Sequence, residues 1–259
     1  MRSYEKSEPK KNVFVPPQVK TEKVESFPVI LIKDAGKNYR KEEGVVAPKT
    51  FFVIISGGEK RERNYFNAIL NQDNFSRIKI EFVADPKLLN PDGLLETAKH
   101  KQAHYKTSQE NEPDKMFIIS DVDHFYNDLL RIKPKCRKLD IPLIISNSCF
   151  EVWLYYSKFS DQPTDFEISM EPLRISQCFK KYLGDKVVGG VNPRKAIFDI
   201  YANIQNAKTN YIEDGNGIPE LFSTNMFVLA EELLPVIDKE LKRMIVENEE
   251  RSVEYKREH

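Results

Sequence analysis

Residues 51–70 of the sequence are FFVIISGGEKRERNYFNAIL. The first six residues form a continuous apolar run rich in β-branched side chains, which is typical of a strand buried on both faces. Gly57 and Gly58 end that run, and the apolar residues of YFNAIL then recur at helical spacing. The stretch therefore predicts a buried strand, a tight glycine turn and an amphipathic helix.

Further strands and helices of the same kind follow along the chain. Strands are predicted over residues 78–83, 116–120 and 142–146, and helices over 91–109, 124–132 and 149–159. Pro134 predicts that the helix begun at residue 124 ends before it. Strands that alternate with helices in this way indicate a parallel sheet covered on both faces.

The remainder of the chain is predicted to be helical, over residues 171–182, 193–211 and 223–255. Ser223 or Thr224 would cap the last of these helices, and Pro235 would kink or split it. The fold class is therefore α/β, with four parallel strands flanked by helices and a helical C-terminal part. We expect an N-terminal extension over residues 1–50, partly mobile and with a short strand at 27–33, an α/β domain over 51–160, and a helical region over 161–259.

Composition limits the classes of function. The 259 residues include 40 basic and 40 acidic side chains, so the net charge is zero and bulk electrostatics cannot hold a nucleic acid. Any such contact needs a local basic patch, a metal or a partner. Three widely spaced cysteines form no metal-ligand or disulfide pattern, and neither an export signal nor a membrane span is predicted, so we expect a cytoplasmic protein.

Polar residues follow three of the four predicted strands. Glu59 follows the first strand, Asp121 and Asp123 follow the third, and Asn147 and Glu151 follow the fourth. The carboxyl ends of parallel strands meet at one edge of the sheet, so Glu59, Asp121 and Asp123 should converge there. Carboxylates gathered in one crevice repel one another unless a cation compensates, and Mg²⁺ prefers such oxygen ligands.

Gly57 and Gly58 fit the same site, because glycine lets a phosphate approach backbone N–H groups closely. Other interpretations remain open for the acids. Asp-x-Asp after a strand also serves as turn and capping chemistry, and Glu151 is also explained as an acid favoured by the helix dipole. Trp153 is expected in the core.

Two longer motifs resemble a known family. Gly58-Glu59 before a helix, with Asp121-Val122-Asp123 after a later strand, is similar to the Toprim signature of topoisomerases, primases and OLD-type nucleases. More specifically, GGEKRERNYFNAIL and SNSCFEVWLYYSKF resemble the two motifs of the RloB family, over about residues 51–234. Ser148 stands where that family usually has Pro, and Ser56-Gly57 replaces its commoner Cys-Glu pair.

The resemblance implies a Toprim-like catalytic domain that binds Mg²⁺, or Mn²⁺, through Glu59, Asp121 and Asp123, with further catalytic roles for Asn147 and Glu151. It also implies basic residues that contact the phosphates of a substrate, at Lys180, Lys181, Arg194 and Lys195. The solvated face of a helix explains these four residues equally well.

RloB-like proteins resemble effectors of bacterial phage defence, found near ABC-type ATPases in some loci. The resemblance therefore implies a metal-dependent nuclease that cuts DNA or RNA, tRNA among them, held silent by its own assembly into a homo-oligomer or by an ATPase partner. The alternative is a regulatory module that binds a nucleotide or nucleic acid without cutting it. A third interpretation is a phosphatase of the haloacid-dehalogenase type with Asp121 as its nucleophile, although no Asp-Asp pair occurs in the chain.

Overall fold

The computed structural model describes residues 50–70, 75–84, 90–108, 111–168 and 172–258. The predicted N-terminal extension and its strand at 27–33 lie outside these residues. Four strands form one sheet, namely β1 (Thr50–Ser56), β2 (Ile78–Val83), β3 (Lys115–Asp121) and β4 (Leu143–Ser146). All three strand pairs are parallel, which confirms the predicted α/β class.

The strand order is β2-β1-β3-β4, so the chain leaves β1 toward one edge of the sheet and later returns to the other side of β1. The reversal lies between β1 and β3. Such a switch point opens a crevice outside the carboxyl ends of the two strands, and ligands of open α/β sheets bind there. The segments that follow β1 and β3 are the ones predicted to carry the site.

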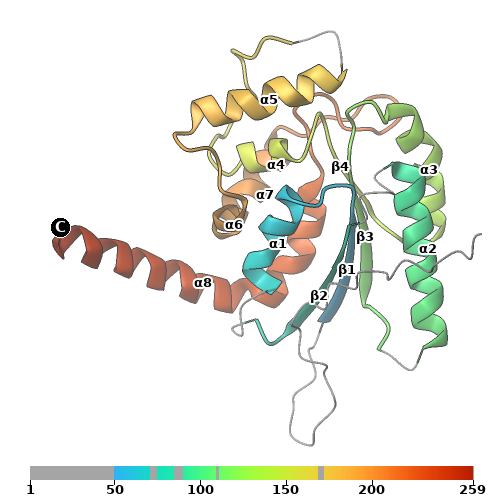
Figure 1. Ribbon diagram of the computed structural model, residues 1–259, viewed down its shortest axis with the longest axis horizontal. Coiled ribbons are helices and arrows are strands. Elements are labelled where there is room, and N and C mark those ends of the chain that lie inside the picture. The colour runs from blue at the N-terminus through green and yellow to red at the C-terminus, as the bar shows by residue number, and fades with distance from the viewer. Residues whose placement is uncertain (1–49, 71–74, 85–89, 109–110, 169–171, 259) are drawn as a thin grey trace, which may run out of the picture. The chain divides into compact units, whose positions relative to one another are not determined.

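Helices cover both faces of the sheet (Figure 1). The helices α2 (Pro91–Thr107) and α3 (Tyr126–Lys138) lie on one face, where they pack against Phe51, Val53 and Ile55 of β1. Phe52 and Ile54 point to the other face and join a core that includes α1 (Arg61–Leu70) and α4 (Glu151–Tyr155). Strand β1 is therefore buried on both faces, as its unbroken apolar run predicts.

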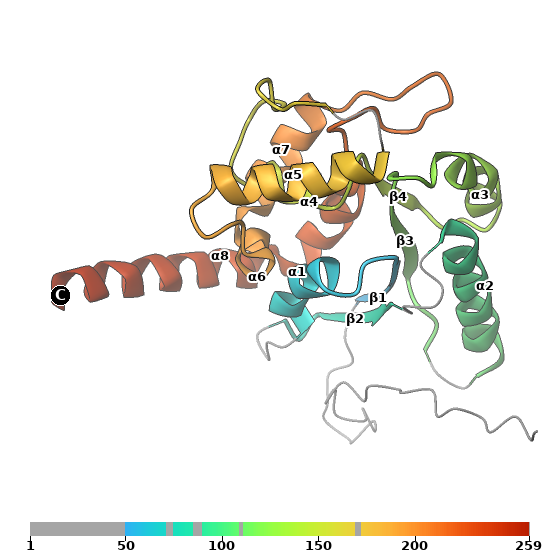
Figure 2. The same ribbon diagram turned by 45° about the horizontal axis from the view of Figure 1, so that its top comes forward.

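The helical C-terminal part completes that second core. It consists of α5 (Pro172–Lys186), α6 (Pro193–Ala196), the 3₁₀ helix η1 (Ile197–Asp199), α7 (Ile200–Thr209) and α8 (Met226–Glu258). Figures 1 and 2 show α5 at the end of the sheet toward which the strands' carboxyl ends point. The same views show the last turns of α8 running out beyond the sheet.

The prediction that Pro134 ends its helix is wrong, and Pro235 does not split its helix. Helix α3 continues through Pro134, and α8 continues through Pro235. Both prolines lie on exposed positions of their helices, so the carbonyl group that loses its N–H partner can bond to water instead. Leu129, Ile132 and Cys136 hold the apolar face of α3 in the core on both sides of its proline.

Other boundaries differ from the predictions as well. The helix expected over residues 193–211 is divided into α6, η1 and α7, and the helix expected over 149–159 is reduced to the five residues of α4. Before α8, the hydroxyl Oγ1 of Thr224 accepts the backbone N–H of Met226 at 3.2 Å. Thr224 therefore fills the capping role, while Ser223 bonds to the backbone of residues 210 and 212.

The free side of β4 is covered by the segment before α8. Ser146 and Thr224 form an isolated antiparallel bridge, and their hydroxyl oxygens lie 2.8 Å apart. The side chain of Asn225 bonds to the backbone N–H of Ile145 at 2.5 Å and to the carbonyl of Leu143 at 3.1 Å. In the described part of the chain no helix is both long and apolar enough to cross a membrane.

Candidate active site

A pocket of about 350 Å³ lies at the switch point between β1 and β3. Its walls come from the turn after β1, the start of α1, the end of β3, the start of α4 and the middle of α5. The lining residues are Gly57, Gly58, Glu59, Lys60, Arg61, Glu62, Asp121, Glu151 and Lys180. Four acids and three cations therefore share one crevice.

Glu62 is the acid that the turn after β1 buries. It lies in the first turn of α1, only 6% of its surface is exposed, and its carboxylate lies against the Cα of Gly58. A side chain at residue 58 would occupy the place of that carboxylate, which explains the glycine. Burial raises the pKa of Glu62 to about 7, and the charge of Glu151 adds to the effect.

Asp121 ends β3 and faces the same pocket. Its Oδ1 atom is fully buried and has no hydrogen-bond partner among the described residues. Burial, followed by the charges of Glu62, Glu151 and Asp123, raises the pKa of Asp121 well above its usual range. A buried carboxylate oxygen without a partner is costly, so the arrangement calls for a proton or a cation at this position.

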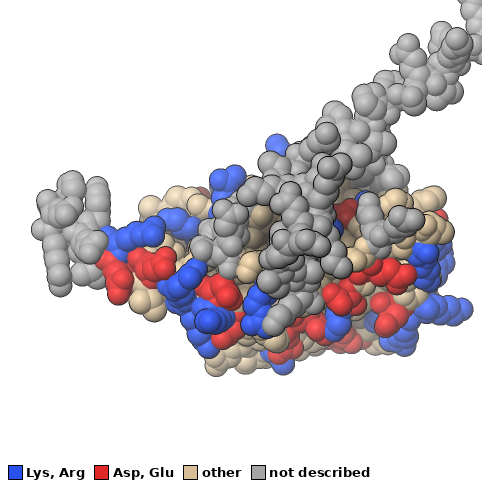
Figure 3. Space-filling view, turned by 90° about the horizontal axis from the view of Figure 1, so that it is seen from below, with Lys and Arg blue, Asp and Glu red and all other residues tan. Residues whose placement is uncertain are grey.

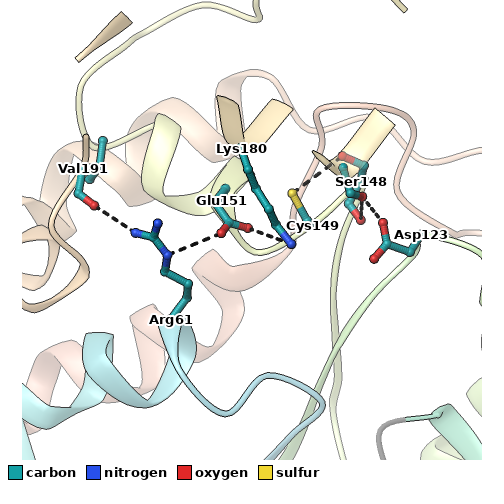
Figure 4. Close-up of polar contacts among 8 residues, drawn as sticks. Arg61, Asp123, Ser148, Cys149, Glu151, Lys180 and Val191 are labelled. Atoms are coloured by element: carbon teal, nitrogen blue, oxygen red, sulfur yellow. Dashed lines mark hydrogen bonds and ion pairs between the residues drawn. The ribbon is translucent and has the colours of Figure 1, made fainter. Parts of the chain in front are cut away.

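Glu151 links the pocket to two cations, as Figure 4 shows. Its Oε1 lies 3.6 Å from Nε of Arg61, and its Oε2 lies 3.8 Å from Nζ of Lys180. The Glu151 side chain is only 6% exposed, whereas those of Arg61 and Lys180 are 52% and 46% exposed. Burial alone would lower the pKa of Lys180, but the neighbouring carboxylates, Glu151 first, raise it overall.

Asp123 lies beside the pocket and is held by α5. It adopts a left-handed backbone conformation, with φ of 31°, which Asp tolerates better than most residues. Its Oδ1 accepts a hydrogen bond from Oγ of Ser176, and its backbone N–H donates to the carbonyl of Ser148 at 3.2 Å. Burial raises the pKa of Asp123, while Lys180 opposes that shift. Ser176 and Lys180 are one helical turn apart, so one face of α5 reaches two of the acids.

A family model described as RloB-like protein matches residues 52–233. The chain belongs to the RloB-like family. No curated protein and no solved structure matches it. The matched range of this RloB-like protein runs from β1 into α8, so it contains every residue that lines the pocket.

The structure brings together several of the predicted site residues. Gly57, Gly58, Asp121, Glu151 and Lys180 all line the pocket, as does Glu59, whose side chain is exposed at its rim. Their predicted chemical roles stay predictions. Sequence reasoning missed Glu62 and Arg61, which carry no motif signal of their own, since an acid in the first turn of a helix is ordinary.

The other predicted site residues lie outside the lining of the pocket. Nδ2 of Asn147 donates to the carbonyl of Pro219 at 2.8 Å, which fixes the loop before α8. Nε of Arg194 donates to Oδ1 of Asn64 at 3.2 Å, and both Lys181 and Lys195 are exposed. Trp153 is fully buried in the core, as expected.

The acids of the RloB-like pocket fit a divalent cation of the Mg²⁺ type. The unpartnered Oδ1 of Asp121 is the oxygen that such an ion would satisfy, and burial, followed by the charges of neighbouring acids, raises the pKa values of Glu62 and Asp121. No three carboxylate, imidazole or thiol side chains converge on one point in the described residues. An ion in this pocket would therefore have to be held by one or two carboxylates such as that of Asp121, with water and a substrate phosphate as its other ligands.

Proposed function

We propose that this RloB-like protein is a metal-dependent nuclease, a phosphodiesterase that cuts DNA or RNA in the cytoplasm as an effector of antiphage defence. The observation that carries the proposal is the buried, unpartnered Oδ1 of Asp121 beside Glu62 and Glu151 at the switch point of the sheet. Neighbouring acids that cannot all stay ionised without a cation are typical of sites that hold a metal and a phosphate together.

Each residue has a distinct part in the proposed reaction. Asp121, with one of the other predicted ligands Glu59 and Asp123, would hold Mg²⁺ or Mn²⁺, and that ion would polarise the phosphate and activate water. Glu62 has a pKa of about 7, so near neutral pH its carboxylate can take a proton from the attacking water and release it later. Arg61 and Lys180 offset negative charge on the phosphate.

A nuclease panel tests the proposal. Purified protein with Mg²⁺ or Mn²⁺ is incubated with tRNA, single-stranded DNA and RNA, and duplex DNA, and Asp121→Asn is assayed alongside it. We expect cleavage by the wild-type protein and a loss of at least about 100-fold in Asp121→Asn, because the metal loses its central carboxylate. Glu112→Gln is the matched control. Glu112 is an exposed acid just before the first residue of β3, at the end of this strand away from the pocket.

Absence of cleavage on every substrate, or full activity in Asp121→Asn, would remove the nuclease proposal. A second assay addresses the defence role. The wild-type and Asp121→Asn genes are expressed in a bacterium, and growth is compared with and without phage. Wild-type expression should restrict phage or halt growth during infection, and the variant should do neither.

The second candidate function is a regulatory module that binds a nucleotide or nucleic acid without cutting it. The ion pairs of Glu151 with Arg61 and Lys180 favour it, because they neutralise one acid of the pocket without any metal. The zero net charge of the chain fits this candidate too. Binding without cleavage, together with an undiminished biological effect in Asp123→Asn, would support it over the nuclease.

A further inference from the structure

Two cations from distant segments meet at one acid of the pocket. Arg61 is the first residue of α1 and Lys180 lies in α5, yet both head groups reach the carboxylate of Glu151. Figure 4 shows Glu151 between them, and Nη1 of Arg61 also donates to the carbonyl of Val191 at 3.4 Å. A single buried anchor therefore sets the positions of two half-exposed cations.

These cations have more donors than Glu151 uses. A guanidinium has five N–H donors and an ammonium three, and the two ion-pair distances of 3.6 and 3.8 Å are longer than direct hydrogen bonds. A phosphate that enters the pocket can therefore accept hydrogen bonds from both side chains. It would use the donors on the solvent-facing side of each head group, which Glu151 does not use. Positioned cations of this kind are the usual partners of phosphate oxygens.

The charges around the pocket limit how many phosphates can be bound. Lys60, Arg61 and Lys180 are the cations of its lining, and four acids line it with them. Figure 3 shows the molecule from below, on the side away from α5 and the pocket, where basic and acidic side chains also lie side by side. Several exposed lysines elsewhere are already paired with acids, namely Lys158 with Asp199, Lys186 with Asp165 and Lys208 with Glu231.

The pocket itself is small. Its volume of about 350 Å³ lies at the lower end of the range for small-molecule sites, which is roughly 300–1,000 Å³. Such a volume suits one nucleotide unit with its phosphates, and a duplex cannot enter it. Contacts inside the crevice can therefore reach about one nucleotide unit of the substrate.

We propose that Arg61 and Lys180 form the phosphate subsite of this pocket, and that the substrate is a single-stranded segment recognised at about two phosphates. This inference rests on the proposed function for the identity of the substrate as nucleic acid. Glu151 is a positioning residue in it, because it acts on the substrate only through the two cations that it holds.

The test is the salt dependence of binding, measured by fluorescence anisotropy on the full chain with Ca²⁺ in place of Mg²⁺. The probes are a labelled single-stranded tetranucleotide, a longer single strand and a duplex of the same sequence. The logarithm of the affinity should fall with the logarithm of the salt concentration with a slope of about −1.4, since each phosphate contact of a single strand contributes about −0.7. A slope steeper than about −3, or a duplex bound as tightly as the single strand, overturns the inference.

Three variants localise the effect. Lys180→Gln should weaken binding roughly tenfold and make the slope shallower by about 0.7, and Lys180→Arg should restore both. Lys186→Gln is the matched control, because Lys186 is another half-exposed, ion-paired lysine of α5 that does not line the pocket. Equal losses in Lys180→Gln and Lys186→Gln would overturn the subsite.

Glu151→Gln tests the positioning role. Removing its charge frees both cations from their common anchor, so binding of the tetranucleotide should weaken at least twofold at an unchanged Tm, whereas a merely structural role predicts weaker binding only together with a lower Tm. Unchanged or tighter binding would overturn the positioning role. Cleavage is scored separately with Mg²⁺. Cleavage with a steep salt slope would refute the subsite and leave the nuclease proposal standing. The expected binding pattern without any cleavage would support the subsite and refute the nuclease proposal.

Discussion

Replacing Glu62 by glutamine should make the metal-free protein more stable at pH 8 while it removes a carboxylate that the proposed reaction needs. Glu62 is buried, lies against Gly58 and is repelled by Glu151, and for these reasons its pKa rises to about 7. Glutamine has nearly the same shape and keeps an oxygen that can accept a hydrogen bond. It carries no charge, so burial costs it less.

The size and the sign of the effect follow from the pKa shift of Glu62. In the unfolded chain its pKa is 4.5, so between pH 4.5 and 7 the folded state binds a proton that the unfolded state does not. The free energy of unfolding therefore falls as the pH rises through this window, and is lowest above pH 7. A shift of about 2.5 units at about 1.4 kcal/mol each gives at most about 3.5 kcal/mol, or roughly 7–14 °C in Tm.

Thermal unfolding in EDTA at pH 5 and pH 8 measures this difference. Glu62→Gln should melt well above the wild type at pH 8, and the gap should nearly close at pH 5. Glu59→Gln is the matched control, because Glu59 is exposed and three residues away, so its Tm should equal that of the wild type at both pH values. A Glu62→Gln protein that is no more stable than the wild type at pH 8 would refute the claim that the buried Glu62 carboxylate destabilises the metal-free protein.

The wild-type protein should gain Tm on addition of Mg²⁺, and Asp121→Asn should lose most of that gain, which differential scanning fluorimetry can follow. Gly58→Ala should lower any cleavage at least about tenfold, because its methyl group takes the place of the Glu62 carboxylate. Gly184, in α5, has open space around it, so Gly184→Ala should instead stabilise the chain by about 0.5–1 kcal/mol in urea unfolding. Trp153→Ala should cost about 3–5 kcal/mol in the same measurement, since the side chain is fully buried. Asn147→Ala should cost about 1 kcal/mol through the lost bond to Pro219 and leave the Mg²⁺-induced gain in Tm intact.

The sheet was predictable because its strands carry strong local signals. A strand buried on both faces needs an apolar side chain at every position, and β1, β3 and β4 show this as unbroken runs. Helix ends were less predictable. Proline usually ends a helix. Pro134 and Pro235 do not, because they lie at exposed positions and the buried residues on either side of them keep α3 and α8 in the core.

The edge of the sheet at which the pocket lies was also predictable, but the residues that line it were only partly so. The glycine turn after β1 and the Asp-x-Asp after β3 indicated this edge of the sheet. Whether Glu59 or Glu62 turns inward depends on the direction in which α1 leaves that turn, and the sequence contains no pattern for that direction. Arg61 and Lys180 both reach Glu151 only because α5 packs at the end of the sheet. No residue spacing along the chain predicts that packing.

The order in which the segments that line the pocket are synthesised also affects the fate of incomplete chains. Glu62, Asp121, Glu151 and Lys180 belong to four segments that emerge one after another during translation. A nascent chain, or a proteolytic fragment that ends before α5, lacks Lys180 and leaves Glu151 with one cation fewer, while the side of β4 covered by Thr224 and Asn225 stays open. Such a fragment has an incomplete pocket and an exposed strand edge, which favours its degradation. Partly synthesised copies of this protein would therefore be open to proteolysis before their pocket is complete.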